Sequence, residues 1–379
     1  MIPLSNFKID FKKLKEIDKL MLFSMIALMI FGIINIYLAS SAEYGTLFLK
    51  RQSLWFVVCL VALYFVLAVD YTLLKSYTPL FYWGSILLLI VTLFIGTDIN
   101  GARGWIRLGP ASFQPAELAK IATIMMLGKT LEDMNGTINE LKNFLTMAFY
   151  AVVPAIFIVI QPDMGMTMVL FFMVVGIFFI AGLDIRVFGA GALAVIVGIV
   201  IVWNSGLIQP YQKTRITSFM NPESDSSQSG YQLRQSLISI GNGGVLGLQG
   251  NSIINENSVG YAGQYVPEVQ TDFIFASIAE QWGLIGACFL LLLYGILISR
   301  MIAIARTSKD TFGSIISVGL VSYFLFALLQ NIGMTIGLVP ITGITLPLLS
   351  YGGTSLLTTV MSIGLILNIG MRRKKIYFW

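Results

Sequence analysis

Histidine is absent from this chain of 379 residues, cysteine occurs only twice, and charged residues make up 11% of the composition. The lack of histidine excludes imidazole metal ligands and an imidazole general base. Cys59 and Cys288 both lie inside apolar runs. We therefore expect two small core residues rather than a disulfide or a metal-binding pair.

The shortage of charge accompanies a large excess of apolar residues. Hydrophobic residues make up 56% of the chain, and the mean hydropathy is +0.83. A soluble protein cannot bury so much apolar surface, so the composition predicts a polytopic membrane protein. The sequence has no repeat of fixed period and no sign of a second domain, so residues 1–379 are predicted to form a single membrane domain.

The N-terminal sequence lacks the short apolar core and the small-residue cleavage site of a signal peptide. Residues 1–19 are therefore predicted to be a retained cytoplasmic head. Ten segments then have the character of membrane spans, which predicts an all-α fold of ten transmembrane helices with both termini cytoplasmic. The predicted spans are Leu20–Ala39, Leu54–Val69, Leu80–Ile95, Pro115–Leu131, Phe144–Ile160, Met164–Gly182, Val187–Trp203, Asp272–Ser299, Phe312–Ile336 and Ser355–Met371.

The distribution of basic residues supports this orientation. With the N-terminus inside, the predicted cytoplasmic segments hold 16 of the 24 lysines and arginines, and the outer loops hold seven. Such a bias marks the cytoplasmic side of a membrane protein. The net charge of +5 thus comes mainly from the cytoplasmic flanks, and it indicates no nucleic-acid partner.

Two predicted outer loops, Gly96–Gln114 and residues 204–271, are longer than a simple helix connection needs. Long ordered loops are more often functional than not. Within the second loop, Asn221–Gly230 is predicted to be flexible. The glycine-rich run Gly241–Gly250 is either another flexible segment or a place where backbone amides approach a phosphate.

The end of the long loop carries the acids that we expect to be central. Glu268 and Asp272 precede the apolar run of the eighth span, and Glu280 lies inside it. An ionisable side chain at a membrane boundary is costly and is functional by default, although Asp272 could also be an ordinary helix N-cap. Residues eight apart lie on nearly the same helix face, so Asp272 and Glu280 predict a water-accessible cleft.

Further candidates lie near the starts of other spans. Glu117 and Lys120 are three residues apart, so they share a helix face and can pair. They form either a structural ion pair or a site in which Lys120 holds a carboxylate or phosphate and Glu117 tunes it. Asp163, in a tight outer turn, either caps the sixth span or shares an outer cavity with Asp272, where one carboxylate would raise the pKa of the other.

Prolines and glycines break the entry to the tenth span in Pro340–Ser355, which includes Ser350. Irregular backbone at membrane depth is tolerated where it lines a cavity. The combined pattern predicts an outward-facing cavity with several acids and several basic residues, suited to an anionic, lipid-attached head group. The residues alone leave an enzyme and an ion-coupled transporter open.

Six blocks resemble the signature motifs of the SEDS family, named for shape, elongation, division and sporulation. They are NGARGWIRLGPASFQPAELAK, QPDMG, YQKTRITSFMNP, GYQLRQSLISIGNGGVLG, PEVQTDFIFASIAEQWGLIG and GLVPITGITLPLLSYGGTS. They occur in the family's order over nearly the whole chain, and the RodA-like elongation branch is the most similar. The resemblance implies a ten-helix peptidoglycan glycosyltransferase of the bacterial cytoplasmic (inner) membrane. Its active site would face outward and would polymerise lipid II.

Matched by motif, the resemblance implies that Asp272 is the essential acid, with Glu117 and Lys120 as its catalytic companions. The predicted substrate-binding residues are Asp163, Arg103, Arg107, Arg215, Arg234, Glu268, Glu280 and Ser350. Several auxiliary positions depart from the family pattern: Gly104 replaces a basic residue, Met166 a threonine and Gln281 an acid, and Val269 and Gln270 replace basic-type residues.

The expected reaction uses Asp272 as a general base on a sugar hydroxyl of the incoming lipid II. That hydroxyl would displace the lipid pyrophosphate of the growing chain with inversion, while Lys120 or outer arginines stabilise the leaving group. No cofactor is certain, and a divalent cation, Mg²⁺ or Mn²⁺, is a candidate. The expected partners are lipid II, the growing glycan strand, membrane lipids and a class B penicillin-binding protein. The alternatives are a lipid II flippase and a non-catalytic scaffold for that protein.

Overall fold

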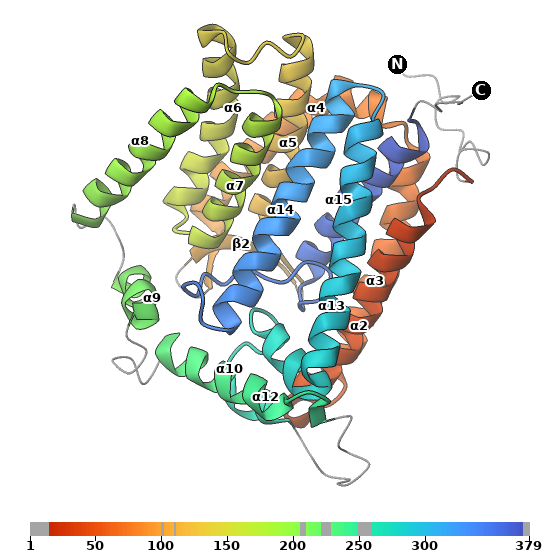
Figure 1. Ribbon diagram of the computed structural model, residues 1–379, viewed down its shortest axis with the longest axis vertical. Helices are drawn as coiled ribbons and strands as arrows, with labels where there is room; N and C mark the ends of the chain where they lie inside the picture. Colours follow the sequence, from red (N-terminus) through yellow and green to blue (C-terminus); the bar gives the residue numbers. More distant parts are fainter. Residues whose placement is uncertain are drawn as a thin grey trace.

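The computed structural model describes residues 15–99, 102–109, 111–204, 210–220, 229–248 and 260–373. These residues form a bundle of helices with one small sheet (Figure 1). Each of the ten predicted spans coincides with a helix. The helices are α2 (Lys19–Tyr44), α3 (Leu47–Ala68), α4 (Tyr71–Ile95), α5 (Pro115–Asp133), α6 (Leu141–Ile160), α7 (Met164–Ile180), α8 (Ile185–Asn204), α13 (Ile274–Thr307), α14 (Thr311–Thr335) and α15 (Gly353–Met371).

Seven of the described helices are long and apolar enough to cross a membrane: α2, α3, α4, α6, α13, α14 and α15. The chain is therefore a mostly helical, multi-pass membrane protein, as its composition predicts. The apolar stretches of α7 and α8 are shorter. Helix α5 has 19 residues but carries five charged ones. Glu117 and Lys120 in its first turns are buried and pair with each other, and the other three charged residues lie within its last five residues.

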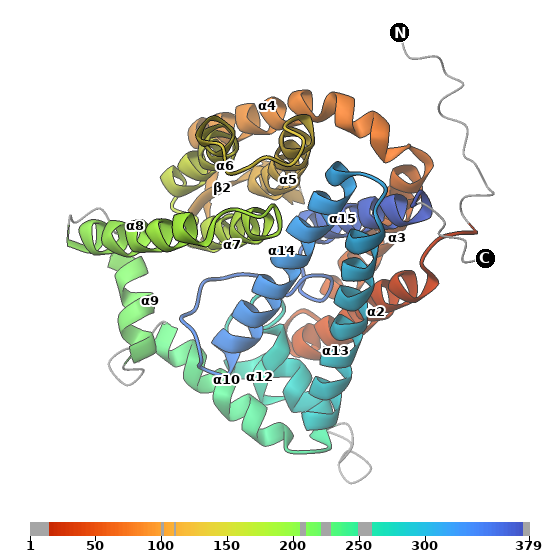
Figure 2. The same ribbon diagram turned by 45° about the horizontal axis from the view of Figure 1, so that its top comes forward.

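Helix α14 lies at the centre of the bundle and packs against α5, α7 and α13. Its side chains Phe324, Ala327 and Asn331 have no exposed surface. The outer helices instead turn large apolar side chains outward, among them Leu54 on α3 and Leu80 on α4, which are 65% and 70% exposed. This distribution suits a lipid environment, where an apolar exterior carries no penalty. Helix α8 extends away from the bundle in both ribbon views (Figures 1 and 2).

The two long loops are ordered where the structure describes them. The first forms a three-stranded antiparallel sheet, β1 (Thr97–Ile99), β2 (Ala102–Leu108) and β3 (Ala111–Phe113). The second contains α9 (Pro210–Met220), α10 (Ser229–Gly243) and α12 (Tyr261–Tyr265), which gather at one end of the bundle (Figure 1). Of the segment predicted to be flexible, residues 221–228 lie outside the described residues.

The described part of the glycine-rich run is docked against α13. A Cβ added to Gly243 would lie 2.0 Å from the carbonyl oxygen of Ala279, and one added to Gly247 would lie 2.4 Å from that of Gln281. At the contact α13 is kinked at Gly283, whose φ is +63°. The amide of Leu284 donates to the carbonyl of Gly244 at 3.0 Å. The close backbone approach that glycine permits is thus used here for helix packing, and contact with a phosphate stays a prediction.

Candidate active site

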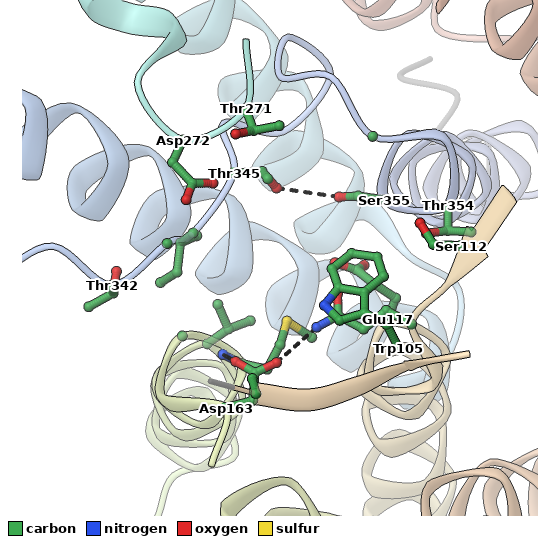
Figure 3. Close-up of a pocket in the computed structure, with 18 of the residues that line it drawn as sticks. Trp105, Ser112, Glu117, Asp163, Thr271, Asp272, Thr342, Thr345, Thr354 and Ser355 are labelled. Atoms are coloured by element: carbon green, nitrogen blue, oxygen red, sulfur yellow. Dashed lines mark hydrogen bonds between the residues drawn. The ribbon is translucent and has the colours of Figure 1, made fainter. Parts of the chain in front are cut away.

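A cavity of about 340 Å³ lies at the start of α13. Its wall comes from β2 and β3, the first turns of α5 and α7, the turn before α13, and the irregular segment 336–352 between α14 and α15 (Figure 3). Its charged lining consists of four carboxylates and, within the described chain, one cation: Glu117, Asp163, Glu268, Asp272 and Arg215. Hydroxyl groups and aromatic rings form much of the rest: Trp55, Trp105, Ser112, Thr271, Tyr323, Thr342, Thr345, Tyr351, Thr354 and Ser355.

A tight turn places Asp272 in this wall. The carbonyl of Glu268, which has a φ of +55°, accepts hydrogen bonds from the amides of Thr271, Asp272 and Phe273 at 3.1, 3.1 and 3.4 Å. Helix α13 begins only at Ile274, with Phe273 as its N-cap. Asp272 therefore belongs to the turn, and the alternative in which it is an ordinary N-cap is wrong.

The Asp272 carboxyl group faces the cavity from one side, and Asp163 faces it from the other (Figure 3). Burial raises the pKa of Asp272 from its ordinary value of 3.8 to about 7; the neighbouring charge of Glu268 adds to this rise and Arg215 opposes it. The backbone at Gly343 passes close to this carboxyl group. A Cβ on Gly343, whose φ is +73°, would lie 3.3 Å from Asp272 Oδ2. Asp272 is thus a carboxylate whose proton affinity suits a general base near neutral pH.

Glu117 and Lys120 form the predicted pair, but only Glu117 reaches the cavity. Lys120 Nζ donates to Glu117 Oε2 at 2.8 Å, and the side chain of Lys120 is 2% exposed. The same carboxylate oxygen accepts from Thr358 Oγ1 at 2.8 Å. The ammonium also lies 3.6 Å from the centre of the Tyr323 ring, which forms part of the cavity wall. Lys120 therefore stands behind the wall and acts on the cavity through Glu117.

Asp163 is both a helix cap and part of the cavity that contains Asp272. The predicted effect of each carboxylate on the pKa of the other is not observed, because burial is the main cause at both residues. The Oδ1 atom of Asp163 accepts from the amide of Met166 at 2.9 Å and so caps α7. Its Oδ2 accepts from Gln114 Nε2 at 2.8 Å, and the residue lines the same cavity as Asp272. Burial raises the pKa of Asp163, and the two hydrogen bonds oppose that rise. The carboxylate is held in place by its partners and faces Asp272 across the space between them.

Glu280 lies away from the cavity, so the predicted cleft shared by Asp272 and Glu280 is not observed. The helical spacing on which it rested does not apply, because Asp272 precedes the helix. Glu280 is 1% exposed and accepts from the amides of Tyr261 and Ala262 at 2.6 and 2.8 Å. It anchors α12, the helix that leads into the Asp272 turn.

Ser350 also lies behind the cavity wall. Its hydroxyl donates to the carbonyl of Thr271 at 2.6 Å and accepts from the amide of Leu346 at 2.8 Å. Ser350 is 6% exposed and is absent from the cavity lining. In this structure, its contacts are those of a structural residue that fixes the Asp272 turn, and substrate contact stays a prediction.

The predicted basic residues divide into two groups. Arg215 on α9 lines the cavity, and its guanidinium lies close to Gly343 and Asp272. Arg103, Arg107 and Arg234 are exposed and lie outside the lining. Arg215 is therefore the described cation best placed for an anion in the cavity.

The predicted divalent cation has no protein-formed site among the described residues. No three of their aspartate, glutamate and cysteine side chains come close enough together to hold a metal ion. The cavity carboxylates are spread over different walls and are already engaged, Glu117 by Lys120 and Asp163 by Gln114. This donor set does not fit a metal bound by the protein alone.

Comparison with known proteins establishes the family. The profile of the FtsW/RodA/SpoVE family of cell cycle proteins matches residues 18–375. The chain belongs to the FtsW/RodA/SpoVE family. This membership confirms the family resemblance that the six sequence motifs indicated.

Relatives of this family match over almost their whole length. Stage V sporulation protein E of Bacillus subtilis (strain 168) is 36% identical over 367 residues, which are 93% of this chain and 96% of that protein. Peptidoglycan glycosyltransferase MrdB of Escherichia coli (strain K12) is 32% identical over 362 residues, or 95% of each chain. The match thus spans at least 93% of this chain and at least 95% of each of these two relatives.

Solved structures agree with this assignment. A chain from a peptidoglycan synthase complex, in which polymerization and crosslinking are coordinated, superposes with a TM-score of 0.81 at 30% identity and covers 94% of this chain and 98% of its own. The crystal structure of the rod shape determining protein RodA from Thermus thermophilus gives a TM-score of 0.71 at 28% identity, with coverage of 95% and 98%. The chain therefore shares the fold of these solved structures over 94–95% of its length.

Proposed function

We propose that this protein is a peptidoglycan glycosyltransferase that polymerises lipid II into glycan strands. Relatives that bear this name match the chain end to end. The observation that carries the proposal is Asp272, a carboxylic acid with a pKa raised to about 7, in a cavity lined with hydroxyl groups, aromatic rings and one arginine. Such a lining suits a sugar joined to a diphosphate.

In the proposed reaction, Asp272 removes the proton from a hydroxyl group on the incoming sugar. The freed oxygen forms a bond to the anomeric carbon of the growing strand. The bond from that carbon to the lipid diphosphate breaks, and the electron pair leaves with the diphosphate. Displacement from the opposite face inverts the configuration, and no covalent intermediate with the enzyme forms.

The other cavity residues have supporting roles in this proposal. Arg215 stabilises the negative charge of the departing diphosphate, because it is the described cation that lines the cavity beside Asp272. Glu117 and Asp163 accept hydrogen bonds from substrate hydroxyl groups through the oxygens that face the cavity. Lys120 holds Glu117 in its orientation through their ion pair, and the charge of Glu268 adds to the raised pKa of Asp272.

We further propose that all ten span-like helices cross the bacterial inner membrane and that the cavity opens outward. An even number of crossings returns the chain to its starting side. Two ion pairs support this: Asp18 at the start of α2 binds Arg300 near the end of α13 at 2.6 Å, and Asp70 binds Arg372 at the end of α15 at 3.0 Å. In this topology, residues 1–19 form the cytoplasmic head and residues 204–271 the large extracytoplasmic loop of a single domain.

The proposed partner is a class B penicillin-binding protein that crosslinks the new strands. A chain of the same fold acts in a complex that coordinates polymerization with crosslinking. The elongation role remains a prediction, because the matched relatives include a stage V sporulation protein as well as FtsW and MrdB. Restoration of rod shape in cells depleted of their own elongation polymerase, without rescue of division or sporulation mutants, would support it.

The proposal is tested with purified protein in detergent and labelled lipid II, in the presence and absence of the penicillin-binding partner. We expect the wild-type protein to produce glycan strands and Asp272→Asn to produce none. The variant should keep the wild-type elution volume and unfold at a temperature no lower than that of the wild type. Detergent removes the two membrane sides, so a flippase would produce no strands. A scaffold would tolerate Asp272→Asn in cells, and full activity of that variant in vitro would remove Asp272 from its role.

A further inference from the structure

The turn that carries Asp272 is held by a different part of the chain. Three consecutive carbonyl groups, those of Gln270, Thr271 and Asp272, accept hydrogen bonds from outside the turn. The donors are the amide of Tyr351 at 2.8 Å, the hydroxyl of Ser350 at 2.6 Å and the amide nitrogen of Asn331 at 2.8 Å. All three donors lie on α14 or in the segment between α14 and α15.

Asn331 is the innermost of these contacts. It has no exposed surface, and its Nδ2 donates to the Asp272 carbonyl and to the Ile344 carbonyl, both at 2.8 Å. Ile344 lines the cavity on the wall beside Asp272. The amide NH₂ group carries two donors, so one side chain satisfies both carbonyl oxygens, and only the orientation with Nδ2 towards them does so. One side chain therefore joins two walls of the cavity.

The Asp272 carbonyl depends on this contact because it precedes α13 and accepts no hydrogen bond from an amide of that helix. The first amide of the helix ladder, that of Ala276, donates to Phe273 at 3.0 Å. Without Asn331, the part-buried Asp272 carbonyl would lose its partner, which is costly. The turn would relax, and the carboxyl group attached to the same residue would move with it. A displacement of about 1 Å in a reacting group costs on the order of 100-fold in rate.

We propose that Asn331 is a positioning residue for the general base: it holds the Asp272 peptide against the Ile344 wall and thereby aims the Asp272 carboxyl group into the cavity. This inference rests on the proposed glycosyltransferase function. Ser350 has the same role one residue earlier in the turn. Asn331 itself does not touch the substrate.

The test compares two buried asparagines. Asn368 also has no exposed surface, and its Nδ2 also donates to two carbonyls, those of Val66 and Val69, at 2.6 and 2.5 Å. It lies about 22 Å along α15 from the cavity residue Gly353, at 1.5 Å per residue. Asn331→Ala and Asn368→Ala thus remove the same amide group from equally buried sites, one beside Asp272 and one far from it. Asn368→Ala also removes the acceptor of two hydrogen bonds, from Tyr71 and Arg372, so it is the more severe control for stability.

We expect Asn331→Ala to lower kcat per folded molecule at least about 10-fold while KM changes less than about 2-fold, because the lost contact orients a group that acts in the transition state. Asn368→Ala should keep kcat within about 2-fold of the wild type even where its unfolding temperature falls. Equal kcat values for the two variants, or a change confined to KM, would overturn the inference. Asn331→Asp is the second variant, equal in size but with at most one donor for two carbonyls.

Two further measurements separate this inference from the proposed function. Adding Ser350→Ala to Asn331→Ala should lower kcat by less than the product of the single effects, because both residues hold one turn. Hydrogen exchange at residues 271–273 should rise in Asn331→Ala and not in Asn368→Ala, whatever reaction the protein performs. Unchanged exchange there contradicts the inference. A wild-type protein that makes no glycan contradicts the proposed function, and the exchange result then still decides the role of Asn331.

Discussion

Asp272 sits where its ionised form is unfavourable, although the proposed reaction needs that form. Burial and the charge of Glu268 raise its pKa to about 7, and Arg215 limits the rise. The folded protein therefore binds a proton at Asp272 that the unfolded chain, with an ordinary pKa near 3.8, has already released at neutral pH. Reactivity and stability are in opposition at this residue.

The first prediction concerns the pH dependence of the rate. Because the base is active when deprotonated, kcat/KM should rise with pH and level off above about 7. Glu268→Gln removes a charge that raises the Asp272 pKa, so the rising limb should move to lower pH. Initial rates with labelled lipid II across pH 5 to 9 measure both profiles. If the rising limb of the pH profile does not move in Glu268→Gln, the profile does not report the ionisation of Asp272.

The second prediction concerns stability at the same residue. Ionisation of Asp272 destabilises the fold as the pH rises from its unfolded pKa towards about 7, by at most about 4 kcal/mol. Asp272→Asn should therefore unfold at a higher temperature than the wild type at pH 8, and the difference should shrink below pH 5. Thermal unfolding in detergent measures this. A variant that is less stable at pH 8 would indicate that the carboxylate is stabilised by contacts in the turn.

The third prediction concerns the Glu117–Lys120 pair. Lys120→Met leaves the buried Glu117 carboxylate without its counterion, which should lower the free energy of unfolding by about 3–5 kcal/mol. Adding Glu117→Gln should restore much of that stability but none of the polymerase activity. Lys129→Met is the control on the same helix, because its partner Asp133 is 51% exposed, and it should cost less than about 1 kcal/mol. Equal losses at Lys120 and Lys129 would contradict the prediction.

The sequence predicted the charged members of the site and missed the neutral ones. Asp272, Glu117, Lys120 and Asp163 were found because a charge near a membrane span is too costly to be accidental. Asn331, Tyr323 and Thr358 were missed, since single polar residues in apolar helices have no local signature. Their importance comes from what they contact across the bundle, and those contacts join residues up to 241 positions apart.

At the scale of elements, the sequence predicted the helices but not the structure of the segments that connect them. The length of each apolar run predicted the position of each described span. Helix α13 nevertheless begins after Asp272, because the amides of residues 271–273 donate to the Glu268 carbonyl and form a turn. The sheet of the first outer loop and the docking of α10 on α13 depend on contacts between distant segments. No periodic pattern in the sequence reports such contacts.

The fourth prediction uses the docking of α10 on α13. A Cβ on Gly243 would lie 2.0 Å from the backbone oxygen of Ala279, whereas one on Gly241, in the same helix, meets nothing within 4 Å. Gly243→Ala should therefore force the helices apart and lower both stability and activity. Gly241→Ala should leave activity unchanged and stabilise α10 by up to about 1 kcal/mol. Equal effects of the two substitutions would show that the helices separate without penalty.

At the scale of the whole molecule, the fifth prediction tests the orientation. In a variant with Cys59 and Cys288 replaced by alanine, Thr46→Cys lies in the exposed α2–α3 connection and Lys142→Cys in the exposed first turn of α6. The proposed topology places the first outside and the second inside the cell. A membrane-impermeant maleimide should label Thr46→Cys in intact cells and Lys142→Cys only after permeabilisation. The reverse pattern would invert the topology.

The hydrogen bonds that join the Asp272 turn to the segment between α14 and α15 have a pharmacological consequence. A small molecule bound between these two backbone segments would displace the Asp272 carboxyl group and so inactivate the general base, while the cavity stayed open to substrate. Such a compound would need no likeness to a sugar or a diphosphate, and raising the substrate concentration would not displace it. Resistance would then arise at residues such as Asn331 and Ser350, where each substitution also damages the catalyst.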